Sequence, residues 1–335
     1  VSFQPGAVLK ARTITLHVGP ITTPVTATQL LYRTTDQLGH PAADVTTVIA
    51  PLPRPVLPRI VGYLSFYDGL GPKCDPSYTL AGGDAGPATN SQAEDEELLM
   101  GYYLANGWIV TVPDFEGRHL HWMAGRESGQ ATLDGIRATE SALGLGTATQ
   151  VALSGYSGGA VAADWASELA PRYAPELTLS AVAEGGIPVD YAHLFSYVNG
   201  SAVFGAAMPG ILLGLARAYH FPLDRFLSSY GKKLVRAESR TCITEDFGNY
   251  PGLTIRKLFK PRFREPFKVS AIARLFNAQI MGGAPGHPLV PLFMGIGDVD
   301  GFGDGVMRTA DVETLAREYC RQGVPVEFRH YGAGH

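Results

Sequence analysis

The sequence carries one serine in a setting typical of a nucleophile. Ser157 is the centre of "GYSGG" (155–159), a G-x-S-x-G pattern that follows the apolar run 150–156 and precedes an Ala-rich helical pattern at 158–170. A sharp turn from strand to helix strains the serine backbone and leaves room only for glycine two residues before and after it. The turn lifts the hydroxyl above the sheet edge. We therefore expect Ser157 to attack a carbonyl and form an acyl-enzyme.

A serine hydroxyl is a poor nucleophile without a base, and five histidines follow Ser157. In folds with this turn the chain order is Ser, then Asp or Glu, then His. Three of the histidines lie in or beside an irregular segment, and His330 lies within a strand pattern. His335 lies in the loop "YGAGH" after that strand, from which an imidazole can reach across to a serine. We predict that His335 is the general base.

The acid that would orient the imidazole lies in "GIGDVDGFGDGVM" (295–307). Asp298, Asp300 and Asp304 all follow the strand that ends near Ile296, and any of them could be the third member of a triad. Acidic residues at alternating positions in a Gly-rich loop can also hold calcium. A calcium loop of twelve residues with a final Glu is missing, so we expect neither a metal nor a cofactor. The residues alone leave the choice among the three aspartates open.

Stabilising a tetrahedral oxyanion needs two hydrogen-bond donors. One should be the amide of Gly158, which follows the nucleophile. The other should come from the loop after an early strand, and "YLSFYDGLG" (63–71) ends such a strand with Asp68 at the turn. The Asp68 amide could donate while its side chain bonds elsewhere. Alternatively, Asp68 only shapes a turn with Gly69, because Asp-Gly is a frequent turn pair.

Alternating strand and helix patterns must position these groups. Apolar, β-branched strand runs alternate with helix-length segments, which predicts a mostly parallel, doubly wound α/β sheet with helices on both faces. The rhythm fails at 187–287 and resumes at 288. We predict a core of residues 1–186 and 288–335 and a mainly helical cap or lid insertion at 187–287, which ends in a Gly/Pro linker at 281–288. The strand patterns are 44–50, 59–66, 108–114, 150–156, 177–186, 288–297 and 324–331, and the helical ones 94–107, 129–144, 158–170 and 309–322.

Composition limits the partners. The 335 residues carry a net charge of −4, which argues against nucleic acid, and no apolar run is long enough to span a bilayer. We interpret Val1 as a mature or trimmed start. Of three cysteines, Cys320 falls on an apolar helical face, which predicts a buried thiol. The other two lie in polar loops, where a secreted protein would pair them and a cytosolic enzyme would keep them reduced.

Several stretches taken together resemble one family, the secretory lipases of the α/β-hydrolase superfamily. The resemblance covers most of the chain and is weakest in the insertion. The stretches that carry it are "SFYDGLGPKCDPSYTLAGG" (65–83), "GWIVTVPDFEG" (107–117), "GRESGQATLDGIRA" (125–138), "GYSGG" (155–159) and 304–335.

The resemblance implies an α/β-hydrolase with a cap between nucleophile and acid, acting on acylglycerols and other carboxylic esters. It implies Asp68 and Gly158 as oxyanion donors, and a disulfide between Cys74 and Cys242 that ties the oxyanion loop to the cap. It favours Asp304 as the acid over Asp298 and Asp300, because in the family the acid is followed, one residue on, by a small apolar pair that leads into a helix. The loop 297–304 is longer and richer in glycine than the family pattern.

The leading hypothesis is a secreted, extracellular serine ester hydrolase of lipase type, without cofactor. We expect an ester or lipid substrate, with a lipid–water interface as one setting, and a monomer. The apolar segment 201–218 is expected to line an acyl-binding tunnel or to form a movable lid. A small-ester carboxylesterase or acyltransferase with the same triad is the alternative. A catalytically inactive hydrolase fold that serves as a binding module is a third hypothesis.

Overall fold

The computed structural model describes residues 3–19, 21–283 and 286–335. Val1 and residues 284–285 of the expected Gly/Pro linker lie outside this range. The described residues form one nine-stranded sheet in the order β1-β2-β3-β5-β4-β6-β7-β8-β9. Its strands are β1 (Val8–Val18), β2 (Ile21–Thr35), β3 (Pro41–Ile49), β4 (Arg59–Leu64), β5 (Trp108–Pro113), β6 (Gln150–Tyr156), β7 (Thr178–Gly185), β8 (Leu292–Gly297) and β9 (Val326–Tyr331).

The sheet is mostly parallel, as predicted. The strands from β5 to β9 in this order pair in parallel, and only β1, β2 and β3 add antiparallel pairs at one side. The central strands β4 and β5 are buried along almost their whole length. Parallel strands of this kind need cover on both faces, which explains their continuous apolar runs. The long hairpin of β1 and β2 was not predicted, because threonines and basic residues interrupt its apolar positions and no apolar run marks it. Much of β1 is exposed, whereas the second half of β2 is largely buried.

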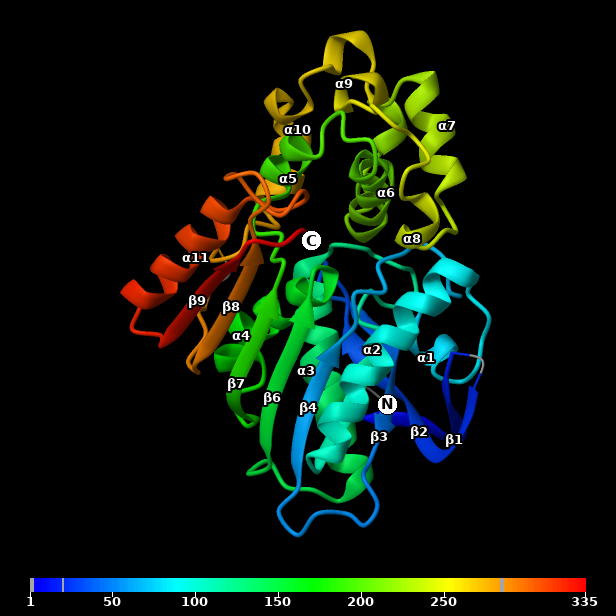
Figure 1. The fold of residues 1–335 in the computed structure, drawn as a ribbon, viewed down its shortest axis with the longest axis vertical. Coiled ribbons are helices and arrows are strands. Elements are labelled where there is room, and N and C mark those ends of the chain that lie inside the picture. The colour runs from blue at the N-terminus through cyan, green and yellow to red at the C-terminus, as the bar shows by residue number, and fades with distance from the viewer. Residues whose placement is uncertain (1–2, 20, 284–285) are drawn as a thin grey trace.

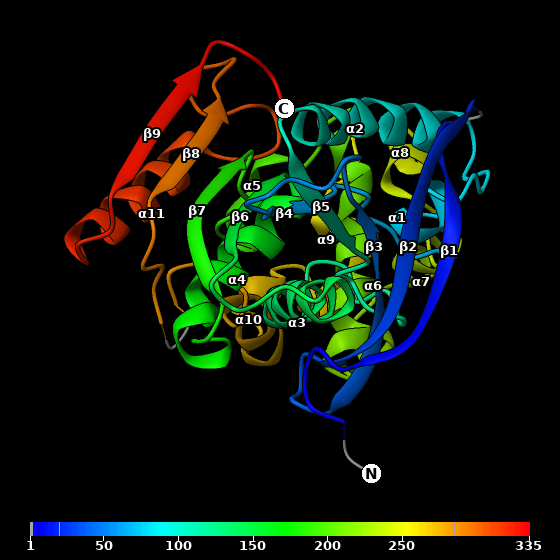
Figure 2. The same cartoon turned by 90° about the horizontal axis from the view of Figure 1, so that it is seen from below.

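Helices cover both faces of the central strands (Figure 2). One face carries α2, and the opposite face carries α3, α4 and α11, where the Tyr319 hydroxyl donates to Asp164 at 2.8 Å. α2 begins seven residues before its predicted start, because its first turns are polar and only Pro87 marks them. The helices of this part are α1 (Pro76–Thr79), α2 (Pro87–Ala105), α3 (Gly125–Leu143), α4 (Gly158–Tyr173) and α11 (Thr309–Arg321).

The prediction of a buried Cys320 is wrong. Its thiol is exposed and free at the end of α11. The residues Val312, Leu315, Ala316 and Tyr319 form the buried stripe of this helix. Cys320 lies one step of about 100° further around the helix, beyond the edge of that stripe.

Short helices between β7 and β8 lie above the carboxyl ends of the parallel strands (Figure 1). That edge is where open α/β sheets bind their ligands. The elements are α5 (Tyr191–Tyr197), η1 (Phe204–Ala206), α6 (Ala207–Ala218), η2 (Leu223–Arg225), α7 (Ser229–Ala237), α8 (Ile243–Asp246), α9 (Ile255–Leu258), η3 (Pro261–Phe263), η4 (Pro266–Lys268) and α10 (Ser270–Asn277).

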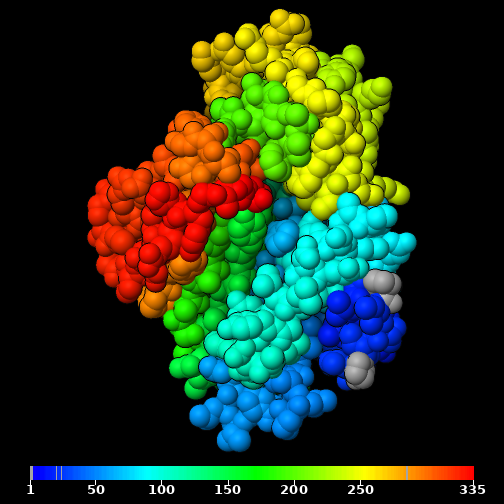
Figure 3. Space-filling model, viewed as in Figure 1, coloured from blue at the N-terminus to red at the C-terminus, as the bar shows by residue number. Residues whose placement is uncertain are grey.

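One part of the sheet faces solvent. Figure 3 shows β6 and β7 in green, open to view between α2 and the C-terminal residues. A groove of about 580 Å³ lies on this face and is lined by apolar residues that include Tyr102, Phe293 and Tyr331. The groove contains neither Ser157 nor His335. A second cavity, which shares Tyr156 with the groove, contains both of these predicted site residues.

Candidate active site

The turn between β6 and α4 has the geometry that the G-x-S-x-G pattern predicts. Ser157 has φ 53° and ψ −118°, a strained backbone conformation for a residue with a Cβ. Its amide donates to the Gly185 carbonyl at 2.9 Å, which locks the turn to β7. A Cβ at Gly155 would overlap the Gly159 carbonyl, and one at Gly159 would overlap the Leu64 carbonyl of β4. The two glycines therefore allow the close approach of strand and helix that holds the serine.

Two further side chains complete a hydrogen-bonded chain with Ser157. His335 Nε2 lies 2.8 Å from Ser157 Oγ, and His335 Nδ1 lies 2.7 Å from Asp304 Oδ2. The Asp304 side chain is fully buried, and its other oxygen accepts from the amides of Val306 at 2.8 Å and Met307 at 2.6 Å. The His335 amide donates to the Asp304 carbonyl at 2.8 Å. The three residues thus form the nucleophile–base–acid arrangement that acyl transfer requires.

Asp298 and Asp300 lie in the same loop as Asp304 but take no part in its hydrogen bonds to His335 and Ser157. The Asp298 carboxylate accepts from the Gly301 amide at 2.7 Å, and Asp300 accepts from the amides of Phe302 and Gly303. The Tyr197 hydroxyl adds a contact to Asp300 at 2.9 Å. Backbone hydrogen bonding, with that of Gly303 largest, lowers the pKa of Asp300 although desolvation opposes it. Both residues behave as turn formers. Among the described residues, no group of three or more His, Cys, Asp or Glu side chains could hold a metal ion.

The Asp68 carboxyl lies against Gly158. A Cβ at Gly158 would overlap Oδ1 of Asp68, and the same oxygen accepts from the Trp122 indole at 2.9 Å. Asp68 itself has φ 26°, in the region that favours glycine. Burial raises the pKa of Asp68 to about 6, although the hydrogen bonds from Trp122 and Gly158 and the nearby His335 lower it. The Asp68 side chain is thus bonded to Trp122, and its carboxyl also faces the turn at Ser157.

The loop that carries Asp68 is tied to the segment before α8. Cys74 and Cys242 form the predicted disulfide across 168 residues. Around it, the Ile243 amide donates to the Asp68 carbonyl at 2.9 Å, and the Leu70 amide donates to the Thr241 carbonyl at 2.9 Å. The covalent link and these two hydrogen bonds hold the same pair of segments together, so the position of Asp68 depends on residues far away in the sequence.

α2 holds the start of the same loop. The buried Glu96 accepts from the Ser65 hydroxyl at 2.7 Å and from the Phe66 amide at 3.1 Å, and Gln92 donates to the Phe66 carbonyl at 2.7 Å. Burial raises the pKa of Glu96 to about 7. Sequence reasoning missed Glu96 and Trp122, since each acts through a loop distant in the chain and neither belongs to a short motif.

A cavity of about 440 Å³ opens at these groups and is mostly apolar. The residues 203–211, within the segment expected to line a tunnel or form a lid, contribute four side chains. The lining consists of Phe66, Asp68, Gln92, Trp122, Met123, Tyr156, Ser157, Gly158, Pro188, Leu194, Val203, Phe204, Ala207, Ile211, Ile243, Phe247, Val306, Met307 and His335. Gly214 does not face the cavity, because a Cβ there would overlap the Trp122 carbonyl.

In the part of the chain that the structure describes, no helix is both long enough and apolar enough to cross a membrane.

The chain matches the model of the secretory lipase family over residues 85–335. It is 33% identical to a secreted triacylglycerol lipase of Malassezia furfur, covering 100% of this chain and 69% of that protein. It is 31% identical to a probable inactive lipase of Mycobacterium tuberculosis, covering 97% of this chain and 72% of that protein.

The fold is also that of a solved lipase. The crystal structure of Candida antarctica lipase A superposes with a TM-score of 0.88 at 28% identity, covering 98% of this chain and 77% of that one. The structure of Candida antarctica lipase A supports the predicted α/β-hydrolase fold. The two relatives support the resemblance to secretory lipases found in the sequence. The chain belongs to the secretory lipase family and is a secreted hydrolase.

Proposed function

We propose that the protein hydrolyses carboxylic esters, acylglycerols among them, through an acyl-enzyme on Ser157. His335 takes the hydroxyl proton as Oγ attacks the ester carbonyl and returns it to the leaving alcohol. Asp304 holds the imidazole in its working tautomer and stabilises the imidazolium. Water then attacks the acyl-enzyme with His335 as base again. The observation that carries the proposal is the hydrogen-bonded chain of these three side chains at an apolar cavity.

Asp68 and Gly158 are the proposed oxyanion donors. The Asp68 carboxyl lies beside the Gly158 amide, where the oxygen of a tetrahedral intermediate would need donors. An ionised carboxylate would repel that oxygen, whereas a neutral one can donate a hydrogen bond. Because burial raises the pKa of Asp68 to about 6, the neutral form is accessible in mildly acidic solution. We propose that the neutral form is the active one.

The cavity supports an acyl-binding role. Its apolar lining and its contact with Ser157 suit the chain of a carboxylic ester. We propose that residues 187–287 form a cap over the core of 1–186 and 288–335, with 203–211 along the acyl chain and the alcohol group directed to solvent. The protein is expected to act as a monomer. A small-ester carboxylesterase or acyltransferase is the alternative, since a cavity of about 440 Å³ also admits short acyl groups.

The test is loss of the nucleophile. Ser157→Ala should keep the fold and abolish hydrolysis of p-nitrophenyl esters, because no other group can form the acyl-enzyme. Triad knockouts commonly cost several powers of ten in rate. Ser154→Ala is a matched control, since Ser154 lies on β6 just before the turn that carries Ser157 and contacts Tyr103 instead of His335.

A phosphonate that reacts with active serines separates the hypotheses. Covalent labelling of the parent at Ser157, absent in Ser157→Ala, supports a working hydrolase. An unlabelled parent would favour the catalytically inactive binding module. The name of the mycobacterial relative describes that protein as a probable inactive lipase. Rates on p-nitrophenyl esters of increasing chain length and on an emulsified triglyceride then distinguish lipase from esterase.

A further inference from the structure

The loop between β5 and α3 contains two residues with a strained backbone, and neither has a role in the reaction proposed above. Leu120 has φ 55° and Met123 has φ 67°, a left-handed conformation that residues with a Cβ rarely adopt. Strain of this kind persists only where the surroundings over-determine it, and it concentrates at functional sites. These two residues flank His121 and Trp122 in the sequence, so the strained backbone fixes the direction of the Trp122 indole.

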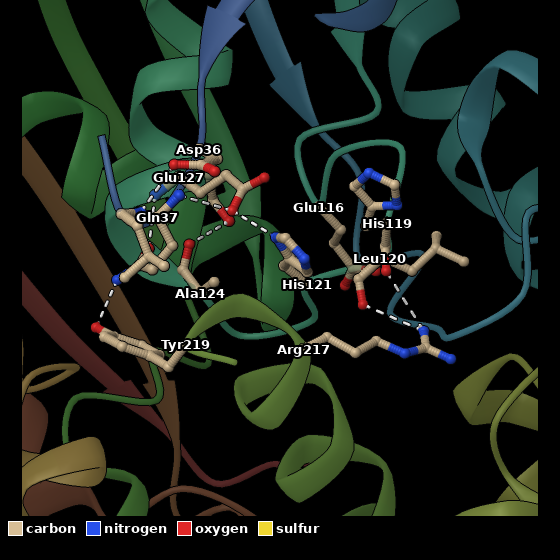
Figure 4. A network of polar contacts seen from close by, with 12 residues as sticks. Asp36, Gln37, Glu116, His119, Leu120, His121, Ala124, Glu127, Arg217 and Tyr219 are labelled. Carbon is tan, nitrogen blue, oxygen red and sulfur yellow. Dashed lines mark hydrogen bonds and ion pairs between the residues drawn. The ribbon is translucent and has the colours of Figure 1, made fainter. Parts of the chain in front are cut away.

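Figure 4 shows how this loop is held. His121 Nδ1 lies 2.7 Å from the buried Glu127 carboxylate, and the His121 amide donates to the Glu116 carbonyl at 2.7 Å. From the other side, Arg217 of α6 directs its guanidinium at the Leu120 carbonyl, 3.5 Å away. The core therefore fixes one side of the loop, and α6 contacts the other.

The indole of Trp122 contacts the proposed oxyanion group directly. Its N–H donates to Asp68 Oδ1 at 2.9 Å, and both side chains are buried. Asp68 in turn lies against Gly158, the residue after the nucleophile. A carboxyl that has to sit beside a tetrahedral intermediate must be placed closely, since misplacement of about 1 Å can cost two powers of ten in rate. Trp122 supplies the side-chain hydrogen bond that limits where this carboxyl lies.

Another part of Trp122 packs against α6, while the residue also lines the cavity. A Cβ at Gly210 would overlap Cζ3 of the indole, and a Cβ at Gly214 would overlap the Trp122 carbonyl and lie 2.8 Å from its Cβ. Residues four apart share one side of a helix, so the two glycines form a notch that fits Trp122. Ala207 and Ile211 on the same helix line the catalytic cavity. One short helix thus contacts both the space for an acyl chain and the residue that holds Asp68.

We infer that Trp122 is a positioning residue that couples the cap helix α6 to the Asp68 carboxyl. The glycine notch sets the place of the indole, and the indole sets the place of the carboxyl. An acyl chain packed on Ala207 and Ile211 holds α6 in position and through it the oxyanion group. Binding energy from a part of the substrate remote from the ester is then expressed in kcat. The inference rests on the proposed function, because it concerns the same reaction.

A double-mutant cycle tests the coupling. Trp122→Phe removes the N–H donor and most of the ring edge, and Gly210→Ala pushes a methyl group at indole Cζ3, an atom that phenylalanine lacks. Each single variant should lower kcat for p-nitrophenyl butyrate by about 10- to 100-fold with little change in KM, because the interaction matters in the transition state. In the Trp122→Phe background, Gly210→Ala should change kcat by less than about threefold, since the overlap with the indole is removed and only a 3.3 Å contact with Glu238 Oε2 remains.

Two matched variants control for general packing. Trp165→Phe shortens another buried tryptophan, whose indole nitrogen has no hydrogen-bond partner among the described residues, and Gly101→Ala adds a methyl group with nothing within 4 Å. Both should keep the parent kcat and KM. Thermal unfolding of each variant shows whether it folds, and should Trp122→Phe not fold, Gly210→Ala alone carries the kcat-against-KM test.

The inference is overturned if either single variant folds and keeps the parent kcat, or if their effects multiply in the double variant. A rise in KM with kcat unchanged would also overturn it, because that would assign the residues to substrate binding alone. Labelling of the parent by the phosphonate is measured in the same experiment. An unlabelled parent refutes the proposed hydrolase, whereas a labelled parent with an uncoupled cycle refutes only the role of Trp122.

Discussion

Two loops at the carboxyl edge of the sheet each bring one aspartate to the site, and they do so in opposite ways. In the acid loop, residues 297–307, the carboxylate of Asp304 accepts from amides two and three residues further on. In the oxyanion loop, residues 65–71, the partners of Asp68 are Trp122, 54 residues away, and the backbone of Ile243. The first loop holds its acid by local turns, and the second depends on the rest of the fold.

The difference has a physical reason. Asp304 has its hydrogen-bond donors within its own turn, at Val306 and Met307, so the loop holds the carboxyl that contacts His335 by itself. Asp68 has to lie beside the serine turn, and a loop that spans from β4 to α1 cannot hold it there alone. The disulfide, the contacts to α2 and the Trp122 indole supply that restraint. We therefore expect substitutions in the acid loop to act on chemistry, and those around the oxyanion loop to act on chemistry and stability together.

The largest effect is expected in the acid loop. Asp304→Asn should lower kcat by about 10⁴-fold, because the amide favours the wrong imidazole tautomer and no longer stabilises the imidazolium. Asp298→Asn and Asp300→Asn should keep kcat within about tenfold of the parent, since a side-chain oxygen still accepts the turn hydrogen bonds. Ester hydrolysis by the three purified variants, with and without chelator, measures this. A dead Asp300→Asn, or a strong effect of chelator, would refute the assignment of Asp304.

Asp68 should show a smaller effect with a pH signature. Asp68→Ala is expected to lower kcat by about 10²- to 10³-fold through loss of one oxyanion donor. Because the pKa of Asp68 is raised to about 6, the parent should lose activity as pH rises through that value and the carboxyl ionises. Asp68→Asn cannot ionise, and its amide can donate. The decline above pH 6 should therefore be absent from its kcat profile.

A decline of the same midpoint in Asp68→Asn would contradict the neutral-carboxyl proposal.

The same group also affects stability. A carboxyl whose pKa is higher in the folded than in the unfolded state contributes stability at low pH, and this contribution is lost as pH rises through about 6. Urea unfolding midpoints should therefore fall less steeply in Asp68→Asn than in the parent as pH rises through about 6. The pH dependence that remains in the variant comes from other buried carboxyls such as Glu96, whose pKa is raised to about 7.

Breaking the disulfide tests the long-range side of the comparison. The variant Cys74→Ala/Cys242→Ala should lose about 2–5 kcal/mol of unfolding free energy, because the bond closes a loop of 168 residues. It should also lose activity, about tenfold, since the bond restrains the Asp68 loop. Thermal unfolding and ester turnover measure the two effects. The matched variant Cys320→Ala removes an exposed free thiol and should change neither.

The effect expected at the cavity wall depends on acyl-chain length. Ala207→Leu adds volume to the cavity wall formed by α6, so it should lower kcat/KM for long p-nitrophenyl esters by about 10- to 100-fold and leave the acetate ester nearly unchanged. Gly214→Phe is unsuitable for this purpose, because Gly214 packs on Trp122 rather than on the cavity. An equal loss on acetate and on long chains would show that residues 203–211 are ordinary packing and do not line the acyl site.

Elements with strong patterns were predictable. The strands β4 to β9 and the helices α3, α4 and α11 lie where their periodicity indicated, within a few residues at each end. The hairpin of β1 and β2 and the polar first turns of α2 were not, because polar residues interrupt the apolar pattern in both. Cys320 was placed on the buried face wrongly, since one residue at the edge of a helical stripe faces either core or solvent according to what packs beside it.

The sequence by itself determined the nucleophile turn. Glycines at 155 and 159 around Ser157 are required by local sterics, so these five residues between a strand pattern and a helical pattern suffice to predict that geometry. The pairing of Asp304 with His335 needed the fold, because three aspartates in one loop share the same local chemistry and only the path of the chain after β9 brings one of them to the imidazole. The place of the Asp68 carboxyl was decided by tertiary structure alone. Its partners come from the loop before α3 and from the segment before α8, and no local pattern encodes contacts between segments that only folding brings together.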